Sequence, residues 1–216
     1  MNTSNTFGKR TMTHPVLQAI TERRTTNLFD PARDIAVTQI GELVHLATRA
    51  PTSFNLQNWR FIAVHERASK VRLRKLAWDQ AKVVDAAVTF IVCGQLADER
   101  TLPLRLQPVV DAGIMPAEMV PGWEGAARSL YNGQPQRQRD EAIRSATLGA
   151  ATLMHAAQAM GLGSAPMIGF DAGAVASEFN LAVYEIPVML VAVGYALPEN
   201  WPQKPRRPLD EVLELA

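Results

Sequence analysis

Residues 161–171 read GLGSAPMIGFD, and their place in the chain decides between two ways of combining helices with strands. Gly161, Gly163 and Gly169 superficially resemble the glycine-rich loop that holds dinucleotide phosphates, but that loop has to follow a strand and open a helix. Here the stretch follows a predicted helix over 139–160 and leads into an extended segment. The reversed order argues against a doubly wound, dinucleotide-binding fold.

Outward from this stretch, helix and strand patterns mix without a regular rhythm. Hydrophobic spacing predicts helices opened by His14-Pro15, capped by Thr38, spanning about 68–78, and running from an Asp171 cap to about Phe179. Apolar runs predict strands over 59–64, 87–93 and 187–193. Because no strand–helix–strand repeat appears, the pattern predicts the α+β class.

The predicted helix over 139–160 is rich in small side chains. Its middle holds Ala146, Ala150, Ala151, Ala156, Ala157 and Ala159. Small residues allow another backbone to approach closely, so we expect a central, buried helix. The same residues could form the close-packed element of a dimer.

The composition is that of a globular protein with balanced charge. Of 216 residues, 47% are hydrophobic and 20% charged, and the formal net charge is +1. At about 100–200 residues per domain, this predicts one domain over 13–216 after a disordered lead over 1–12. No basic footprint favours nucleic acid. The uncharged stretch over 145–170 is too interrupted by polar residues to predict a membrane span.

The N-terminus and the cysteine content indicate a cytoplasmic protein. The first ten residues are polar and lack the apolar core of a signal peptide. Cys93 is the single cysteine, which excludes an internal disulfide and suits a reducing compartment. Because it ends an apolar run, we expect a buried strand residue rather than a nucleophile.

Residues 100–137 differ from the rest of the chain in their proline content. They contain Pro103, Pro108, Pro116, Pro121 and Pro135. We interpret them as an irregular insertion with short helices, and long irregular segments of this kind often act as active-site lids.

The usual signatures of nucleophilic and metal catalysis do not occur. The sequence has no P-loop, no nucleophile-elbow pentapeptide and no His-Glu-x-x-His motif. Its histidines are far apart in the sequence, at His14, His45, His65 and His155. The sequence therefore predicts no metal site and no catalytic side chain of these kinds.

Three polar segments remain as candidates for binding. ERRTTN over 22–27 places adjacent arginines after a helix, and the guanidinium fork matches phosphate geometry. APTSFNLQNW over 50–59 offers hydroxyls and amides that can hydrogen-bond a planar ring with polar edges. The glycines of 161–171 let backbone lie flat against a ligand. Each alone also fits an ordinary structure: a solvated helix end, an Asx-type turn and a helix C-cap.

Together with KPRRPL over 204–209, these segments resemble the FMN-dependent nitroreductase family from about Pro15 to Leu213. Residues 23–25 resemble its Arg-Arg-Ser motif, and 50–59 resemble Ala-Pro-Ser-Ser-x-Asn-x-Gln-Pro-Trp. Residues 161–170 match Gly-Leu-Gly-Ser-x-Pro-x-x-Gly-Phe, and 204–209 match Lys/Arg-x-Arg-x-Pro-Leu. The resemblance implies a mixed sheet flanked by helices, in a three-layer sandwich with the Ala-rich helix at its centre.

The resemblance also implies a set of FMN-binding residues. The phosphate and ribityl chain would be held by Arg23, Thr25, Lys204 and Arg206. The partner subunit would contribute Pro51, Thr52, Ser53 and Asn55. The ring would be lined near its reactive N5 by Pro166, Met167 and Gly169, and at its pyrimidine edge by Asp79 and Lys82. The wider set expected to contact the cofactor adds Arg24, Asn27, Gln57 and Ile168.

Three of these positions depart from the family pattern. Asn27 stands where many members carry Lys or Arg, so one phosphate contact is in doubt. Asp79 stands where the family has Asn, which places an acceptor near the ring unless Lys82 offsets it. Ile168 replaces a Glu found in some members and makes the acceptor approach more apolar.

The function that the resemblance implies is reduction by FMN, with NAD(P)H as electron donor and nitroaromatic, quinone or related compounds as acceptors. One site would serve both half-reactions, so the kinetics would be ping-pong. The protein would be a homodimer that shares its flavin sites between subunits, with chemistry at flavin N5 and no catalytic side chain. Two alternatives stay open: a same-fold enzyme that fragments flavin or removes halogens reductively, and a flavin-binding protein without turnover.

Overall fold

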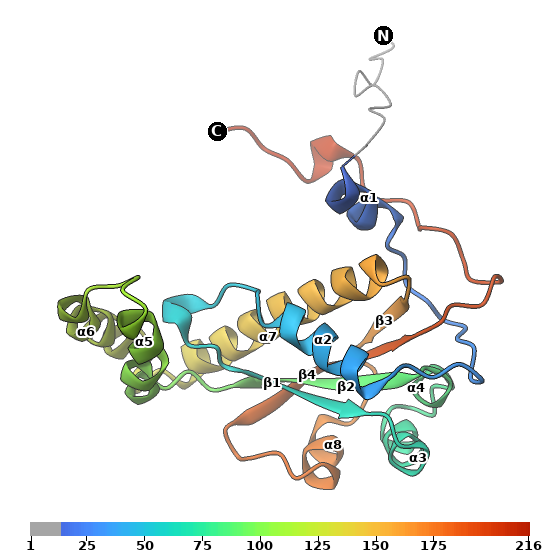
Figure 1. Ribbon diagram of the computed structural model, residues 1–216, viewed down its shortest axis with the longest axis horizontal. Coiled ribbons are helices and arrows are strands. Elements are labelled where there is room, and N and C mark those ends of the chain that lie inside the picture. The colour runs from blue at the N-terminus through green and yellow to red at the C-terminus, as the bar shows by residue number, and fades with distance from the viewer. Residues whose placement is uncertain (1–13) are drawn as a thin grey trace.

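A four-stranded sheet lies between two helical layers, which confirms the α+β class predicted from the sequence (Figure 1). The computed structural model describes residues 14–216, so the lead predicted over 1–12 lies outside the described residues. The helices are α1 Pro15–Glu22, α2 Val37–Ala47, α3 Arg67–Leu76, α4 Lys82–Asp85, α5 Leu102–Asp111, α6 Val120–Tyr131, α7 Pro135–Ala159 and α8 Ala172–Glu178.

The sheet is antiparallel throughout its named strands. These are β1 Trp59–Val64, β2 Val88–Gln95, β3 Gly163–Met167 and β4 Glu185–Gly194, in the order β1-β2-β4-β3. The mixed sheet implied by the family resemblance is therefore corrected: among residues 14–216, parallel pairing is limited to an isolated bridge between Thr25 and Ser164. Residues 163–167 form the edge strand β3, where Pro166 is tolerated because an edge leaves some N–H positions without a partner.

Side chains of β2 alternate between two cores, as the two-residue period of a strand requires. Val88, Phe90 and Val92 pack against α2 and α7. Ile91 and Cys93 face the opposite core with α3 and α8. The helices on both faces thus explain why the run over 87–93 is apolar at almost every position.

The long helix α7 is central and buried, as its alanines predicted. Ala146, Ala150 and Ala157 are fully buried against the sheet. A Cβ added at Gly149 would lie 3.0 Å from the Phe61 ring, so the helix backbone approaches β1 closely. The sheet covers the face of α7 that carries Ala146, Ala150 and Ala157, whereas Ala151 and Ala156 are half-buried and Ala159 is exposed, so the role of this helix in a dimer stays a prediction.

Two helix caps were predicted, and one is correct. The Asp171 side chain accepts a hydrogen bond from the backbone N–H of Ala174 at 2.9 Å and caps α8. Thr38 is not a cap, because α2 begins one residue earlier. The Gln39 side chain instead accepts from the backbone N–H of Ala36 at 3.1 Å, which fixes the earlier start.

The insertion over 100–137 is more helical than its prolines suggested. Pro103 and Pro121 are the second residues of α5 and α6, and Pro135 is the first residue of α7. Proline fits the first turn of a helix because the N–H that it lacks would have no intrahelical partner there. The insertion builds its own small core around Leu102, Leu106, Met115, Ala127 and Tyr131.

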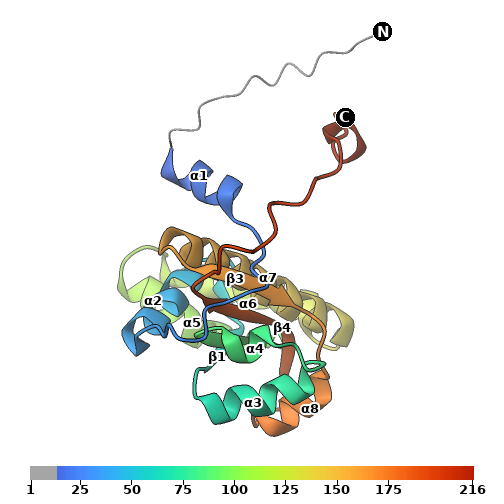
Figure 2. The ribbon, with the colours of Figure 1, turned by 90° about the vertical axis from the view of Figure 1, so that its right-hand side faces the viewer.

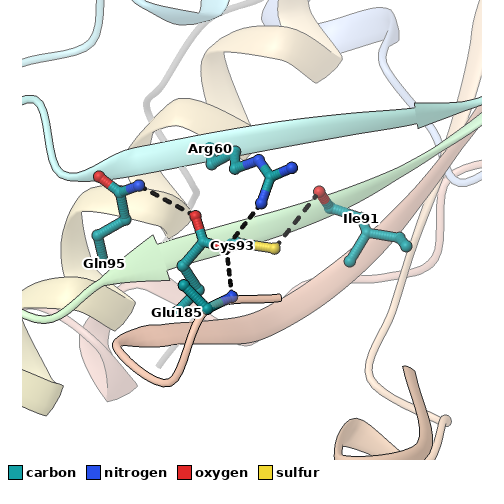
Figure 3. A network of polar contacts seen from close by, with 6 residues as sticks. Arg60, Ile91, Cys93, Gln95 and Glu185 are labelled. Atoms are coloured by element: carbon teal, nitrogen blue, oxygen red, sulfur yellow. Dashed lines mark hydrogen bonds and ion pairs between the residues drawn. The ribbon is translucent and has the colours of Figure 1, made fainter. Parts of the chain in front are cut away.

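A buried carboxylate ties together the end of the sheet near the insertion (Figure 3). Glu185 accepts from Arg60 at 2.7 Å, Gln95 at 3.0 Å and the backbone N–H of Ala182 at 3.0 Å. Nearby, burial is the main cause that raises the pKa of the Cys93 thiol to about 12. Cys93 is thus a buried strand residue, as predicted.

The helix α1 and the chain after β4 project from the same side of the layered body (Figure 2). No residue of α1 is buried, and its apolar Val16, Leu17 and Ile20 are all exposed. The C-terminal segment likewise exposes Trp201 and Leu213.

Candidate functional site

The segments after α1 and after β4 lie side by side, although about 170 residues separate them in sequence. Asn200 holds them together: its Oδ1 accepts from the backbone N–H groups of Asn27 at 2.7 Å and Leu28 at 3.0 Å, and its Nδ2 donates to the Leu28 carbonyl at 2.7 Å. A cavity of about 150 Å³ opens between the two segments. It is lined by Thr25, Asn27, Trp201, Pro202, Gln203, Lys204 and Arg206.

Arg206 lines this cavity, and Arg23 lies two residues before Thr25, which also lines it. The Nη1 of Arg23 is buried and has no hydrogen-bond partner within residues 14–216. Arg206 donates only to the Lys204 carbonyl, at 3.2 Å, and forms no ion pair with the described residues. An orphaned buried N–H costs about 1–3 kcal/mol, so the Arg23 guanidinium fits an anionic partner such as a phosphate, and the exposed Arg206 adds a second cation. We call Arg23–Asn27 and Asn200–Arg206 together the cationic cradle.

A glycine allows the cradle to approach the sheet. The backbone N–H of Thr26 donates to the Ser164 carbonyl at 2.9 Å. A Cβ added at Gly163 would lie 2.4 Å from the Thr26 hydroxyl oxygen, closer than two such atoms can come. Gly163 is therefore required for the parallel bridge that brings residues 23–27 against β3. Arg24 lines a separate cavity of about 450 Å³, which Gly163 also lines.

Lys82 joins the cradle, whereas Asp79 does not. The Lys82 ammonium donates to the Asn27 side-chain oxygen at 3.3 Å, and burial lowers its pKa. Asp79 is exposed and pairs with Arg74, with 2.7 Å between Oδ1 and Nε. The charge that Asp79 introduces is therefore offset by Arg74 rather than by Lys82.

The end of β3 presents an apolar surface next to this cluster. The Met167 side chain is buried in the core, so only its backbone faces outward, while Ile168 is 82% exposed. Trp78 is 74% exposed, and a Cβ added at Gly169 would lie 2.7 Å from its ring. Gln80 fixes this contact because its Nε2 donates to the Gly169 carbonyl at 2.9 Å.

Residues 51–57 lie at the opposite end of the molecule, beside α5 and α6 (Figure 1). Phe54, Asn55 and Gln57 all have positive φ, at 51°, 55° and 48°. Left-handed backbone at residues other than glycine costs on the order of 1–3 kcal/mol each and persists only where the surroundings hold it. One chain therefore brings together Thr25, Asn27, Lys82, Lys204 and Arg206, but it places Pro51, Thr52, Ser53, Asn55 and Gln57 far from them.

Sequence reasoning missed Asn200, Trp78, Gln80 and Tyr131, which contact predicted site residues. Each acts through a partner that is distant in sequence or in an irregular turn, and neither periodicity nor a motif marks it. Trp78 and Asp79 share a left-handed turn, with φ of 50° and 56°. Consecutive left-handed residues that are not glycine are a structural signal of function that the letters alone do not carry.

A larger cavity of about 870 Å³ lies elsewhere, between the start of the insertion and the loop before β4. It contains none of the residues predicted to bind the cofactor, and we place the site at the cradle instead. Residues 14–216 hold no cluster of His, Cys, Asp or Glu suited to a metal ion. None of their helices combines the length and apolarity needed to cross a membrane.

The comparisons with known proteins agree on one family. A family profile described as the nitroreductase family matches residues 20–195. The DrgA protein of Synechocystis sp. is 38% identical over 177 residues, which cover 82% of this chain and 81% of that protein. YodC of Bacillus subtilis, a candidate NAD(P)H nitroreductase, is 29% identical over 196 residues, with 91% and 96% coverage. The solved complex of a candidate nitroreductase from Exiguobacterium sibiricum with FMN superposes with a TM-score of 0.86 at 25% identity, covering 93% of this chain and 97% of the other.

Proposed function

The chain belongs to the nitroreductase family, and from that premise we propose that it is an FMN-dependent reductase that uses NAD(P)H to reduce nitroaromatic, quinone or related acceptors. The observation that carries this proposal is the cationic cradle, where the buried Arg23 Nη1 has no partner and Arg206 no acidic one among the described residues. An FMN phosphate supplies the acceptors that these groups need.

The chain's own residues would bind and orient the cofactor. Arg23, Arg206, Thr25 and Lys204 would hold the phosphate and the ribityl chain. Lys82 and Asn27 already contact each other and would face the pyrimidine edge of the ring. The backbone of 166–169 would lie along the ring near N5. The chemistry supplied by a bound FMN would be two-electron transfer between the nicotinamide donor and the second substrate.

The exposed Trp78 and Ile168 would make the acceptor site apolar. Both are apolar and lie at the end of β3, next to the backbone assigned to the ring. A flat aromatic acceptor can stack there, and so can a nicotinamide ring. Because both substrates would use one surface, we expect ping-pong kinetics.

We further propose that two copies of the chain share each flavin site. The cradle and residues 51–57 lie at opposite ends of one chain, so a second copy is needed to bring the two together. The apolar residues of α1 and of the C-terminal segment, which are exposed in one chain, offer the surface that such a dimer would cover. Single Cys93 suits the cytoplasm as the place of action.

The activity is tested with the purified protein by visible spectroscopy without air. We expect a bound-flavin band that bleaches when NADPH or NADH is added and returns when menadione is added. A protein that remains colourless after incubation with FMN contradicts the proposal. Bleaching without steady-state turnover of any quinone or nitroaromatic indicates a flavin carrier instead.

The shared site is tested with mixed dimers. One chain carries Arg23→Ala and Arg206→Ala, and the other carries Ser53→Ala and Asn55→Ala, each with a different affinity tag. In a shared-site dimer, the intact cradle of one chain meets the intact loop of the other, so the mixed dimer regains about one normal FMN site. If the mixed dimer binds FMN no better than the two parents, the site lies within one chain.

A further inference from the structure

The insertion contacts residues 52–57 at several points. The Phe54 ring packs edge-on against Trp123 and Tyr131, with 6.1 and 6.2 Å between ring centroids. Leu56 is buried in the core of the insertion, and the Asn55 side chain reaches the Arg105 carbonyl at 3.5 Å. These contacts surround the left-handed residues, so the insertion is what holds this strained loop in shape.

Within the loop, one hydroxyl is held by a buried tyrosine. Tyr131 is 1% exposed, and its hydroxyl forms a hydrogen bond with Ser53 Oγ at 2.9 Å. Burial, mainly, raises the pKa of Tyr131; the hydrogen bond with Ser53 lowers it, but the Glu141 carboxylate raises it again, so the phenol stays protonated. Glu141 is itself buried and held by Arg144 and Ser145 of α7.

The contact with Tyr131 fixes the position of Ser53 Oγ. A serine hydroxyl has one proton and two lone pairs, so a single hydrogen bond does not exhaust it. Whichever of the two hydroxyls donates, Ser53 Oγ keeps hydrogen-bonding capacity for a second partner. The Ser53 hydroxyl makes no other hydrogen bond to residues 14–216, so that second partner lies outside the described chain.

We propose that Tyr131 is a positioning residue: it holds the Ser53 hydroxyl where it can hydrogen-bond to the flavin bound by the partner subunit. This inference rests on the proposed function, because it takes the flavin site to be shared. It gives the insertion a role in cofactor binding in addition to the lid predicted from its sequence.

The test is a double-mutant cycle on FMN affinity, with Tyr131→Phe, Ser53→Ala and the pair combined. The phenyl ring of Tyr131→Phe keeps the packing against Phe54 and removes only the hydroxyl. We expect each single variant to weaken FMN binding by about three- to tenfold, the scale of one hydrogen bond. The double variant should bind FMN no more weakly than Ser53→Ala, because Tyr131 acts through Ser53.

Two controls distinguish a positioning role of Tyr131 from an effect of the substitution on folding. Tyr184→Phe removes a hydroxyl that makes no hydrogen bond to the described residues, and it should leave FMN affinity at the parent value. Thermal unfolding of the FMN-free variants shows whether any loss comes from the fold. Losses that multiply in the double variant, or a Tyr131→Phe affinity equal to the parent's, overturn the inference. A parent protein that takes up no FMN overturns the proposed function instead, so the two failures are distinct.

Discussion

Two charged regions lie at opposite ends of the sheet, and they differ in whether the chain itself supplies hydrogen-bond partners for their buried groups. At the Glu185 end, every partner comes from the chain itself: Arg60, Gln95 and the Ala182 N–H satisfy one carboxylate (Figure 3). At the cationic cradle, the buried Arg23 Nη1 has no partner within residues 14–216. A completed network stabilises the fold, whereas an incomplete one indicates a ligand. Changes in the two regions should therefore affect different measurements.

The largest effect is expected in the cradle. Arg23→Ala or Arg206→Ala should each weaken FMN binding by about ten- to a hundredfold, because each removes charge-assisted hydrogen bonds to the phosphate. Binding is measured by the quenching of flavin fluorescence, and the thermal stability of the FMN-free protein should hardly change. Arg207→Ala is the matched control, since Arg207 pairs with Glu211 at 3.0 Å and does not line the cavity. Parent-like FMN affinity in both cradle variants would exclude the phosphate assignment.

The reverse result is expected at the other end of the sheet. Glu185→Gln should lower the free energy of unfolding by about 1–3 kcal/mol and leave FMN affinity unchanged. The lower part of this range is favoured because the Arg60 side chain is 44% exposed and its charge is screened. Urea unfolding measures the change. A loss of FMN affinity with normal stability would contradict the contrast between the two regions.

The same carboxylate gives a pH dependence of stability. Burial raises the pKa of Glu185, but hydrogen bonds from Gln95, Ala182 and Arg60 outweigh it, so the pKa is lowered overall. A lowered folded-state pKa stabilises the protein above the unfolded value of about 4.3, and this contribution disappears as pH falls through the folded value. The stability difference between the parent and Glu185→Gln should thus be full at pH 7 and shrink below about pH 4. A difference that is constant between pH 7 and pH 3 would exclude the mechanism.

Removing the exposed indole of Trp78 should have a moderate effect, and only on the binding of substrates that stack. Trp78→Ala should raise the KM for menadione by about three- to tenfold, the scale of one aromatic stacking contact. Ferricyanide, which does not stack, is the control acceptor and should keep its KM. Equal changes for both acceptors would show that Trp78 shapes the flavin site and not the acceptor site.

The smallest effect is expected at Asp79. Because Arg74 already pairs with this exposed carboxylate, Asp79→Asn should change FMN affinity by less than about threefold. A tenfold gain in affinity would mean that the carboxylate repels the bound flavin despite Arg74.

The sequence predicted the parts of the fold that local patterns encode. The apolar run over 87–93 and the Asp171 cap depend on neighbours in the chain, and both were correct. The prolines of 100–137 misled because proline starts helices as readily as it breaks them, and only its position within the first turn distinguishes the two roles. The antiparallel sheet was missed because strand pairing depends on residues far apart in the chain.

The sequence predicted the motif residues of the candidate site, but not the contacts that bring their segments together. Arg23 and Arg206 stand in recognisable motifs, yet the contact between their segments depends on Asn200, which no motif marks. Asp79 was expected to need Lys82, and the structure pairs it with Arg74 because a left-handed turn at Trp78 and Asp79 reverses the chain. Such long-range and strained contacts arise only when the chain has folded.

The claim that the unsatisfied cations of the cradle hold a phosphate is tested most directly by titrating the FMN-free protein with FMN and with riboflavin side by side. The two ligands share the ring and the ribityl chain and differ only in the phosphate. The account predicts that FMN binds at least about tenfold more tightly than riboflavin, and that Arg23→Ala with Arg206→Ala abolishes most of this difference. Equal affinity of the parent protein for both ligands would contradict it.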